Sequence, residues 1–254
     1  MGTVGKALAL LDILAGPEAR LGLTEIARRA AYDKATTRRM LVELKTAGFV
    51  DQDETRDYLL GPSLLMLGRV REDRFPFARV AGPVVRALAE ATGESAHASE
   101  YSGGVMNSVC AQSSPQSNRV IIEVGARLPL HATASGLAYL AAAKPAFVAS
   151  VLARPLTRFT DRTVTDPAAL SQLLAETRAR GHAQSDQFKE SGVHSVAAAI
   201  LTPQGAPVGA IAVAMPQTRS TPDLLARYGT MVGQAAHDIS ARLYGPTRRE
   251  TSHA

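Results

Sequence analysis

A helical pattern over residues 33–48, DKATTRRMLVELKTAG, constrains the fold of this chain more than any other segment. Asp33 stands where it can cap the first turn, and Gly48 stands where the helix is expected to end. Helical spacing predicts one buried stripe, formed by Thr37, Met40, Leu41 and Leu44. We therefore expect an amphipathic helix whose opposite face, with two adjacent arginines, stays outside the core.

The segments around this helix complete a small domain. Apolar residues recur at helical spacing before it, and two short strand-like segments follow it. The expected order is helices at 4–14, 23–31 and 33–48, then strands at 49–52 and 57–61. Gly16 and Pro17 end the first helix, and Thr24 is placed to cap the second. Three helices, with a short turn between the last two, and then a hairpin indicate a winged helix-turn-helix.

The outer face of the third helix carries residues that suit DNA. Opposite the buried stripe lie Ala35, Arg39, Val42 and Thr46, with Arg38 beside them. In a helix-turn-helix this face enters the major groove, where arginine donates two hydrogen bonds to guanine or pairs with phosphate. The alternative is a solvated face, because residues 1–75 are nearly balanced, with twelve basic and eleven acidic side chains. The order of the elements, rather than the charge, carries the prediction of DNA contact.

Composition places the chain among soluble globular proteins. Of its 254 residues, 46% are hydrophobic and 20% charged, and its formal net charge of +5 weakly indicates an anionic partner. The length suits two modest domains. The single cysteine, Cys110, is expected in the core and cannot form an internal disulfide, and residues 1–16 lack the features of a signal peptide. No apolar run is long enough to span a bilayer, so we expect no membrane partner and a cytoplasmic location.

Residues 62–80 are expected to form a linker helix between two domains. Its clustered leucines suit contact between two chains, although they can also pack on their own domain; they are Leu64, Leu65 and Leu67. Pro76 and Pro83 are expected to break the helical run. The predicted organisation is a winged helix at 1–61, the linker at 62–80 and a second domain at 81–250.

The second domain mixes short strands with helices. Strands are expected at 95–102, 104–113, 119–125, 194–203 and 206–216. One helix should follow the small-residue segment LPLHATASG, a second should begin after Asp166, and a third should run from Pro222 to about Tyr244. Hairpins mixed with helices predict the α+β class with an antiparallel sheet.

Both halves resemble one family. The segment 23–68, with LTEIARRAAYDKATTRRML at its start, resembles the DNA-binding half of IclR-type transcriptional regulators. The segments GARLPLHATASGLAYLA and SGVHSVAAAILTPQGAPVGAIAVAMP resemble the two hallmark segments of their effector domain. The resemblance implies a winged helix-turn-helix, a linker helix and a GAF-like effector-binding domain. It also implies a dimer or tetramer that binds operator DNA and responds to a small carboxylic acid, without a cofactor.

The resemblance carries over DNA contacts to the recognition helix and the wing. The matching candidates are Lys34, Thr36, Thr37, Arg38 and Arg39 in the helix and Arg56 in the wing. The helical pattern places Thr37 half inside the core. The wing turn, DETRDY, is short, acidic apart from its arginine, and lacks the family's turn glycine.

An effector pocket is implied around the start of the helix that follows HATASG. The backbone N–H groups of Ala134, Ser135 and Gly136 are expected to hold a carboxylate at the helix N-terminus. The other candidates are Leu128, Leu130, Asp186 or its neighbour Ser185, Val193, Ser195, Ala212 and Ala214. The two alanines stand where some members that bind very small acids carry hydroxyls, which favours an aromatic or longer acid. Core packing is an equal alternative for Leu130, Val193 and Ala212.

Catalysis is not expected. The six histidines show no paired metal-ligand spacing, and the chain has no G-x-S-x-G motif and no glycine-rich phosphate loop. His131 is read as structural. The expected role is a ligand-responsive repressor of a catabolic operon. The alternative is a GAF-like sensor module or enzyme whose winged helix contacts protein. Repression or activation, and dimer or tetramer, stay open at this point.

Overall fold

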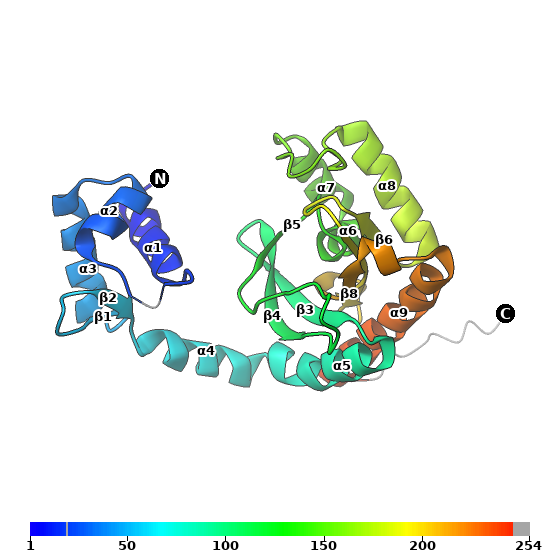
Figure 1. The fold of residues 1–254 in the computed structure, drawn as a ribbon, viewed down its shortest axis with the longest axis horizontal. Helices are drawn as coiled ribbons and strands as arrows, with labels where there is room; N and C mark the ends of the chain where they lie inside the picture. Colours follow the sequence, from blue (N-terminus) through cyan, green and yellow to red (C-terminus); the bar gives the residue numbers. More distant parts are fainter. Residues whose placement is uncertain (19, 246–254) are drawn as a thin grey trace. The chain divides into compact units, whose positions relative to one another are not determined.

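A computed structural model describes residues 1–18 and 20–245, and Figure 1 shows its fold. The chain divides into two compact units between Phe75 and Pro76, inside the predicted linker. Among the described residues, no helix is long and apolar enough to cross a membrane. Each unit has its own hydrophobic core.

The first unit is the predicted winged helix-turn-helix. Its elements are α1 (Thr3–Leu14), α2 (Leu23–Ala30), α3 (Lys34–Thr46), β1 (Val50–Gln52), β2 (Tyr58–Leu60) and α4 (Ser63–Arg74). β1 and β2 form an antiparallel hairpin, and Leu21 adds a bridge to Tyr58. Met40 and Leu41 of α3 are buried against α1 and α2, as the stripe predicted, while Leu44 is only half-buried.

The helix ends in this unit follow local capping chemistry. The Asp33 side chain accepts a hydrogen bond from the Thr36 backbone N–H at 2.8 Å, which confirms the predicted cap of α3. The cap predicted for α2 is wrong: Gly22 holds the N-cap position, and Thr24 lies inside the first turn. Ala31 then adopts a left-handed conformation, with φ of 55°, which turns the chain sharply between α2 and α3.

The second unit is an antiparallel sheet covered by helices, which confirms the α+β class. Its strands are β3 (Ser95–Ser102), β4 (Val105–Gln112), β5 (Arg127–Pro129), β6 (Ala183–Asp186), β7 (Val193–Leu201) and β8 (Pro207–Pro216). They lie in the order β5-β4-β3-β8-β7-β6. The helices are α5 (Phe77–Thr92), α6 (Ala134–Ala142), α7 (Pro145–Leu152), α8 (Pro167–Arg180) and α9 (Pro222–Tyr244). A short 3₁₀ turn, Gln217–Arg219, joins β8 to α9.

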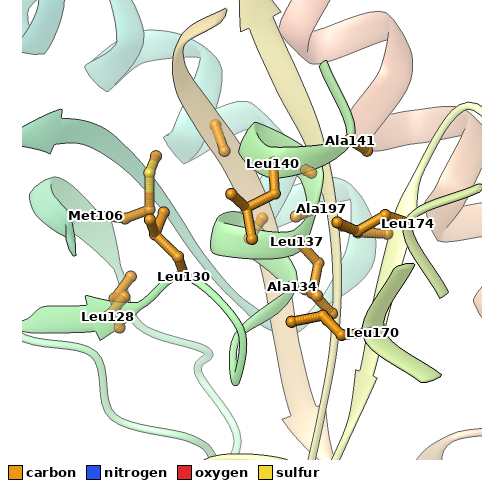
Figure 2. Close-up of a cluster of buried hydrophobic side chains, with 14 of the residues drawn as sticks. Met106, Leu128, Leu130, Ala134, Leu137, Leu140, Ala141, Leu170, Leu174 and Ala197 are labelled. Atoms are coloured by element: carbon orange, nitrogen blue, oxygen red, sulfur yellow. The ribbon is translucent and has the colours of Figure 1, made fainter. Parts of the chain in front are cut away.

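Side-chain size distinguishes the two faces of the sheet. Along β8 the residues alternate, so that Ala210 and Ala212 share the core with α6 while Ile211 and Val213 point to the opposite face. α6 packs on β7 and β8 and is itself contacted by α8, whereas α5 and α9 cover the other face (Figure 1). The layer between α6 and the alanines of β7 and β8 is called the alanine layer. In it, Leu137 and Leu140 of α6 pack over the sheet (Figure 2). This layer fixes where α6 begins, and so positions the pocket described below.

Two predicted features of the second unit are wrong. Residues 119–125 form a loop rather than a strand, because the Ser95 hydroxyl donates to the Val120 carbonyl at 2.6 Å and β5 takes the sheet edge instead. Pro83 does not break the helical run but lies inside α5. The buried face of α5, which includes Phe77, Val84 and Leu88, outweighs the one backbone hydrogen bond that a proline removes.

Candidate functional site

Three arginines of the first unit, Arg20, Arg28 and Arg29, form ion pairs with acidic side chains. On α2, Arg28 and Arg29 both bind Glu25 at 2.6 Å, and Arg29 also binds Glu18 at 2.9 Å. These hydrogen bonds lower the pKa of Glu25 to about 2. Arg20 pairs with Asp53 at 2.9 Å. The charges of these arginines are therefore engaged within the protein.

The cations of α3 are not engaged in this way. Lys34, Arg38 and Arg39 are exposed, and within the described part of the chain none of them has an ion pair with an acidic side chain. They stand at the first turns of α3, where the N-terminal backbone N–H groups add to the positive potential. This set of unpaired cations is the surface that the sequence predicted for contact with phosphate or guanine.

Of the two threonines predicted on the DNA surface, Thr37 belongs to the core, whereas a DNA contact by Thr36 stays a prediction. Thr37 is fully buried and donates its hydroxyl to the Asp33 carbonyl at 2.9 Å, which corrects its placement among the DNA contacts. Thr36 is half-buried, and its backbone N–H is the donor to the Asp33 side chain. Position i+4 from the cap points inward here, because Met40 and Leu41 bury the same face.

Arg56 lies at the tip of the hairpin between β1 and β2. It is exposed and adopts a left-handed backbone conformation with φ of 68°, in the turn where the sequence lacks a glycine. Asp53 shapes this turn, since its carboxylate accepts hydrogen bonds from the Thr55 hydroxyl at 2.6 Å and from the Asp57 N–H at 3.0 Å. The acidic side chain thus serves the turn, and the arginine is the cation that the wing presents.

The second unit contains a cavity of about 250 Å³ at the N-terminus of α6. The predicted residues that line it are Leu128, Ala134, Ser135, Val193, Ser195 and Ala214. Further apolar walls come from the loop 120–126 and from Phe188. The volume lies just below the roughly 300–1,000 Å³ of sites for drug-sized ligands, so the cavity suits a small molecule.

Two backbone N–H groups at the start of α6 are left without a hydrogen-bond acceptor among the described residues. The Thr133 hydroxyl caps the helix by accepting from the Gly136 N–H at 3.1 Å, so that predicted donor is already used. The N–H groups of Ala134 and Ser135 have no acceptor among the described residues, and both residues line the cavity. A helix N-terminus with unpaired N–H groups attracts an anion. The carboxylate site is therefore narrower than predicted, with two N–H groups and the Ser135 hydroxyl.

Gly136 and Leu130 form a packing contact outside the cavity lining. A side chain at position 136 would collide with the Leu130 backbone, so the glycine allows α6 to approach the preceding loop. Leu130 is buried beside Met106 in the core (Figure 2). The structure thus corrects the prediction for both residues and favours the core alternative for Leu130.

Strand alternation settles the choice between Ser185 and Asp186. Ser185 is buried and lines the cavity, with its hydroxyl 3.4 Å from the Ala132 carbonyl. Asp186 points to the other face of β6, where Arg162 binds it at 2.8 Å. The predicted role of Asp186 in the pocket is therefore corrected, and Ser185 takes its place.

The two alanines of β8 also differ. Ala214 lines the cavity, whereas Ala212 is fully buried in the layer under α6 and does not reach it. Of the two positions where some family members carry hydroxyls, only Ala214 therefore faces the cavity. Its apolar side chain forms part of the cavity wall, and Val193, which pairs with the end of the same strand, extends this apolar wall.

Comparison with protein families identifies both units. The model of the IclR helix-turn-helix domain matches residues 3–54, and that of the bacterial transcriptional regulator IclR C-terminal domain matches residues 72–241. The chain belongs to the IclR family. It is 30% identical over 251 residues to the transcriptional repressor IclR of Escherichia coli K12, covering 96% of this chain and 90% of that protein.

Solved structures show the same IclR-family fold. A putative IclR regulator from Silicibacter sp. TM1040 matches with a TM-score of 0.85 and 41% identity, over 96% of this chain and 97% of that one. An IclR homologue from Microbacterium hydrocarbonoxydans, solved with 4-hydroxybenzoate, matches with a TM-score of 0.79 over 95% of this chain and 99% of that one. At 24% identity, the second comparison shows the fold alone.

The IclR relatives are transcriptional regulators and not enzymes, and this chain is a DNA-binding regulator of that family. His131 binds the Thr157 carbonyl at 2.8 Å, which gives it a structural role. Among the described residues, no cluster of histidine, cysteine or acidic side chains could hold a metal ion.

Several lining residues of this IclR-family pocket carried no signal in the sequence. His97 is buried on β3, and its Nε2 lies 3.2 Å from the Ser135 hydroxyl. Burial lowers the pKa of His97 to about 4, with the positive charge of Lys189 as a second cause, so the ring is neutral near pH 7. Lys189 and Glu190 also line the cavity, from the loop between β6 and β7. The one usable signal for His97 is the alternation of side chains along the strand SAHASEYS, which places His97 on the same face as Ser95 and Ser99.

A polar stripe lies beside this histidine on the same face of the sheet. His97 Nδ1, Ser99 Oγ and Ser108 Oγ are all buried and without a hydrogen-bond partner among the described residues. Ser99 and Ser108 face each other across β3 and β4. Buried polar groups of this kind are ordinarily satisfied by ordered water. The floor next to the cavity is thus polar, while its walls are apolar.

Proposed function

We propose that this IclR-family regulator is a repressor of a catabolic operon and that a small aromatic carboxylic acid is its effector. The unpaired N–H groups of Ala134 and Ser135, which open into an apolar cavity, carry the proposal. They would hold the carboxylate, with Ser135 and Ser195 as hydroxyl partners. Leu128, Phe188, Val193 and Ala214 would contact the ring.

The proposed DNA contacts are Lys34, Arg38 and Arg39 on α3, with Arg56 on the wing. Their unpaired charges support this assignment, because Arg20, Arg28 and Arg29 of the same unit are instead paired with acidic side chains. The competing function is a winged helix that binds protein. A protein-binding face is expected to be mainly apolar, and on α3 the exposed large apolar side chain is Val42, which stands among cations.

A thermal-shift screen of small carboxylic acids tests the effector half of the proposal. A ligand that binds only the folded state raises the melting temperature by mass action. We expect benzoate-type acids to raise it more than pyruvate or glyoxylate. The acid bound by the Microbacterium homologue, 4-hydroxybenzoate, belongs in the screen as one of the aromatic probes. Tighter binding of pyruvate or glyoxylate in titration calorimetry would overturn the aromatic assignment.

A gel-shift assay tests the proposal that the protein is a repressor. The probe is the DNA that lies next to the gene encoding this protein. The wild type should shift this DNA, and the best acid from the screen should change the shift. A variant with both Arg38→Ala and Arg39→Ala should bind more weakly, because both unpaired cations are lost. Full binding by this double variant would favour the protein-contact alternative.

A further inference from the structure

We infer that Lys189 is a specificity-determining residue that makes the pocket selective for a carboxylate over the uncharged amide of the same acid. The inference rests on the proposed effector function and deepens it. It assigns a charge partner to a site that otherwise has only backbone N–H groups, a neutral histidine and hydroxyls to receive an anion.

The charges on the cavity lining carry the argument. Among the described residues that line the cavity, Lys189 is the one cationic side chain, and Glu123 and Glu190 are acidic. Neither acid forms an ion pair with Lys189 in the part of the chain that the structure describes. Without Lys189, the ionised side chains of the lining would all be negative. A negative lining would oppose the same anion that the N-terminus of α6 attracts.

Hydrogen bonds to the backbone of its loop, some of them from another segment of the chain, fix the position of Lys189. The Thr163 hydroxyl donates to the Phe188 carbonyl at 2.6 Å, and the Thr160 hydroxyl donates to the Gln187 carbonyl at 2.7 Å. On the far side, the Gln187 side chain accepts from the Gly192 N–H at 2.9 Å. The backbone before and after Lys189 is thus held, so its side chain reaches the cavity from a defined point.

His97 and Lys189 line the same cavity, and the His97 ring contacts Ser135 at the start of α6. The positive charge of Lys189 is, after burial, the second cause of the low pKa of His97. One carboxylate can therefore interact with the N–H groups of α6 and with the ammonium group of Lys189. A neutral amide would keep the hydrogen bonds but lose the attraction between charges.

Matched pairs of acid and amide test this inference in the full-length protein. Calorimetry would compare benzoate with benzamide, and pyruvate with pyruvamide, on the wild type and on Lys189→Gln. We expect Lys189→Gln to weaken binding of the preferred acid roughly 5- to 20-fold and binding of its amide less than about twofold. The wild-type affinity for the acid should also fall as salt is added, and that of the variant should change little.

Two control variants separate this effect from general damage. Lys144→Gln removes an exposed lysine that lies before α7 and outside the cavity lining, so it should leave both affinities unchanged. Glu190→Gln removes an acid from the lining and should tighten acid binding by about two- to threefold.

The outcomes distinguish the two proposals. If the wild type binds acids in preference to amides and Lys189→Gln keeps that preference in full, the assignment of Lys189 is overturned while the effector function stands. If the wild type binds none of the acids, the proposed effector function fails and the inference fails with it. A selective loss of acid binding in Lys189→Gln, with folding unchanged by circular dichroism, supports both.

Discussion

Arg38 and Arg39 are the residues on which DNA affinity is expected to depend most. Replacing either with alanine should cost about 1–3 kcal/mol of operator binding if it contacts guanine, and should reduce the salt dependence if it contacts phosphate. Fluorescence anisotropy at several salt concentrations measures both effects. Arg28→Ala is the matched control, because that arginine is exposed but paired with Glu25. Equal losses in Arg28→Ala and Arg38→Ala would argue against a special role for α3.

His97 should make the stability of the protein depend on pH. Its pKa is about 4 in the folded state, below its usual value of 6.5. Between these values the unfolded chain binds a proton that the folded chain does not, so acid favours unfolding. The free energy of unfolding should therefore fall as the pH drops from about 6.5 to about 4. Burial lowers the pKa of His194 as well, so it adds to this trend.

The measurement is the melting temperature of His97→Gln and wild type from about pH 7 to about pH 5. The variant lacks the titrating ring, so its melting temperature should decline less across this range. Exposed His237 supplies the control, as His237→Gln should keep the wild-type slope. An unchanged slope in His97→Gln would show that His97 titrates as it does in an unfolded chain.

The predicted residues that line the cavity share a local cause. Ala134 and Ser135 precede a helix, and Val193, Ser195 and Ala214 alternate on strands, so their placement follows from short-range periodicity. The prediction placed Asp186 on the wrong face of its strand. It also placed Ala212 at the cavity, whereas Ala212 is buried beneath α6. Both positions depend on which strand lies next to the residue. His97 and Lys189 were missed because they reach the cavity from segments far apart in the chain.

Arg56 is a non-glycine residue in a left-handed position at the tip of the wing. Arg56 adopts a left-handed conformation that costs a non-glycine residue about 1–2 kcal/mol. Arg56→Gly and Arg56→Ala both remove the charge, but only glycine removes the strain. Both variants should therefore lose the same DNA affinity, about one phosphate contact in the salt slope. Arg56→Gly should be the more stable of the two by up to about 1 kcal/mol in urea unfolding.

A stronger effect of Arg56→Ala than of Arg56→Gly on DNA binding would contradict this reading, since it would mean that turn shape rather than charge governs the wing.

Most helices and strands were predictable because their signals are local. Asp33 and Asp166 cap their helices as expected, accepting at 2.8 and 2.7 Å, and α9 spans the predicted residues. The segment 119–125 was misjudged because an apolar run rich in β-branched residues suits a strand, whereas long-range contacts such as the hydrogen bond from Ser95 hold it as a loop. α5 continues through Pro83 because burial outweighs propensity.

The whole molecule is expected to be at least a homodimer, with part of the contact on α4. Among the described residues of this helix none is buried, and Leu65, Met66, Leu67 and Val70 are exposed by 47% to 66%. Apolar side chains clustered on a short helix indicate a partner surface. Two-fold pairing would also let two recognition helices read half-sites about one or more DNA turns apart.

Analytical ultracentrifugation tests this expectation. The wild type should sediment above the 26.8 kDa of one chain, and a variant with Met66→Glu and Leu67→Glu should dissociate at least about tenfold more readily. Val124→Gln, which alters an exposed valine far along the chain, should leave the assembly unchanged. A wild type that sediments as a single chain while binding DNA fully would refute the dimer.

The alanines packed between β8 and α6 belong to the core of the domain, whereas part of the cavity lining comes from loops outside that core. Ala210 and Ala212 are fully buried beneath α6, whereas Val120 and Lys189 stand on loops that are held to the domain by a few hydrogen bonds. Substitutions in those loops change the lining of the cavity at little risk to the fold. Directed evolution of a biosensor from this scaffold should therefore find its new chemical preferences in the two loops, and almost none of them beneath α6.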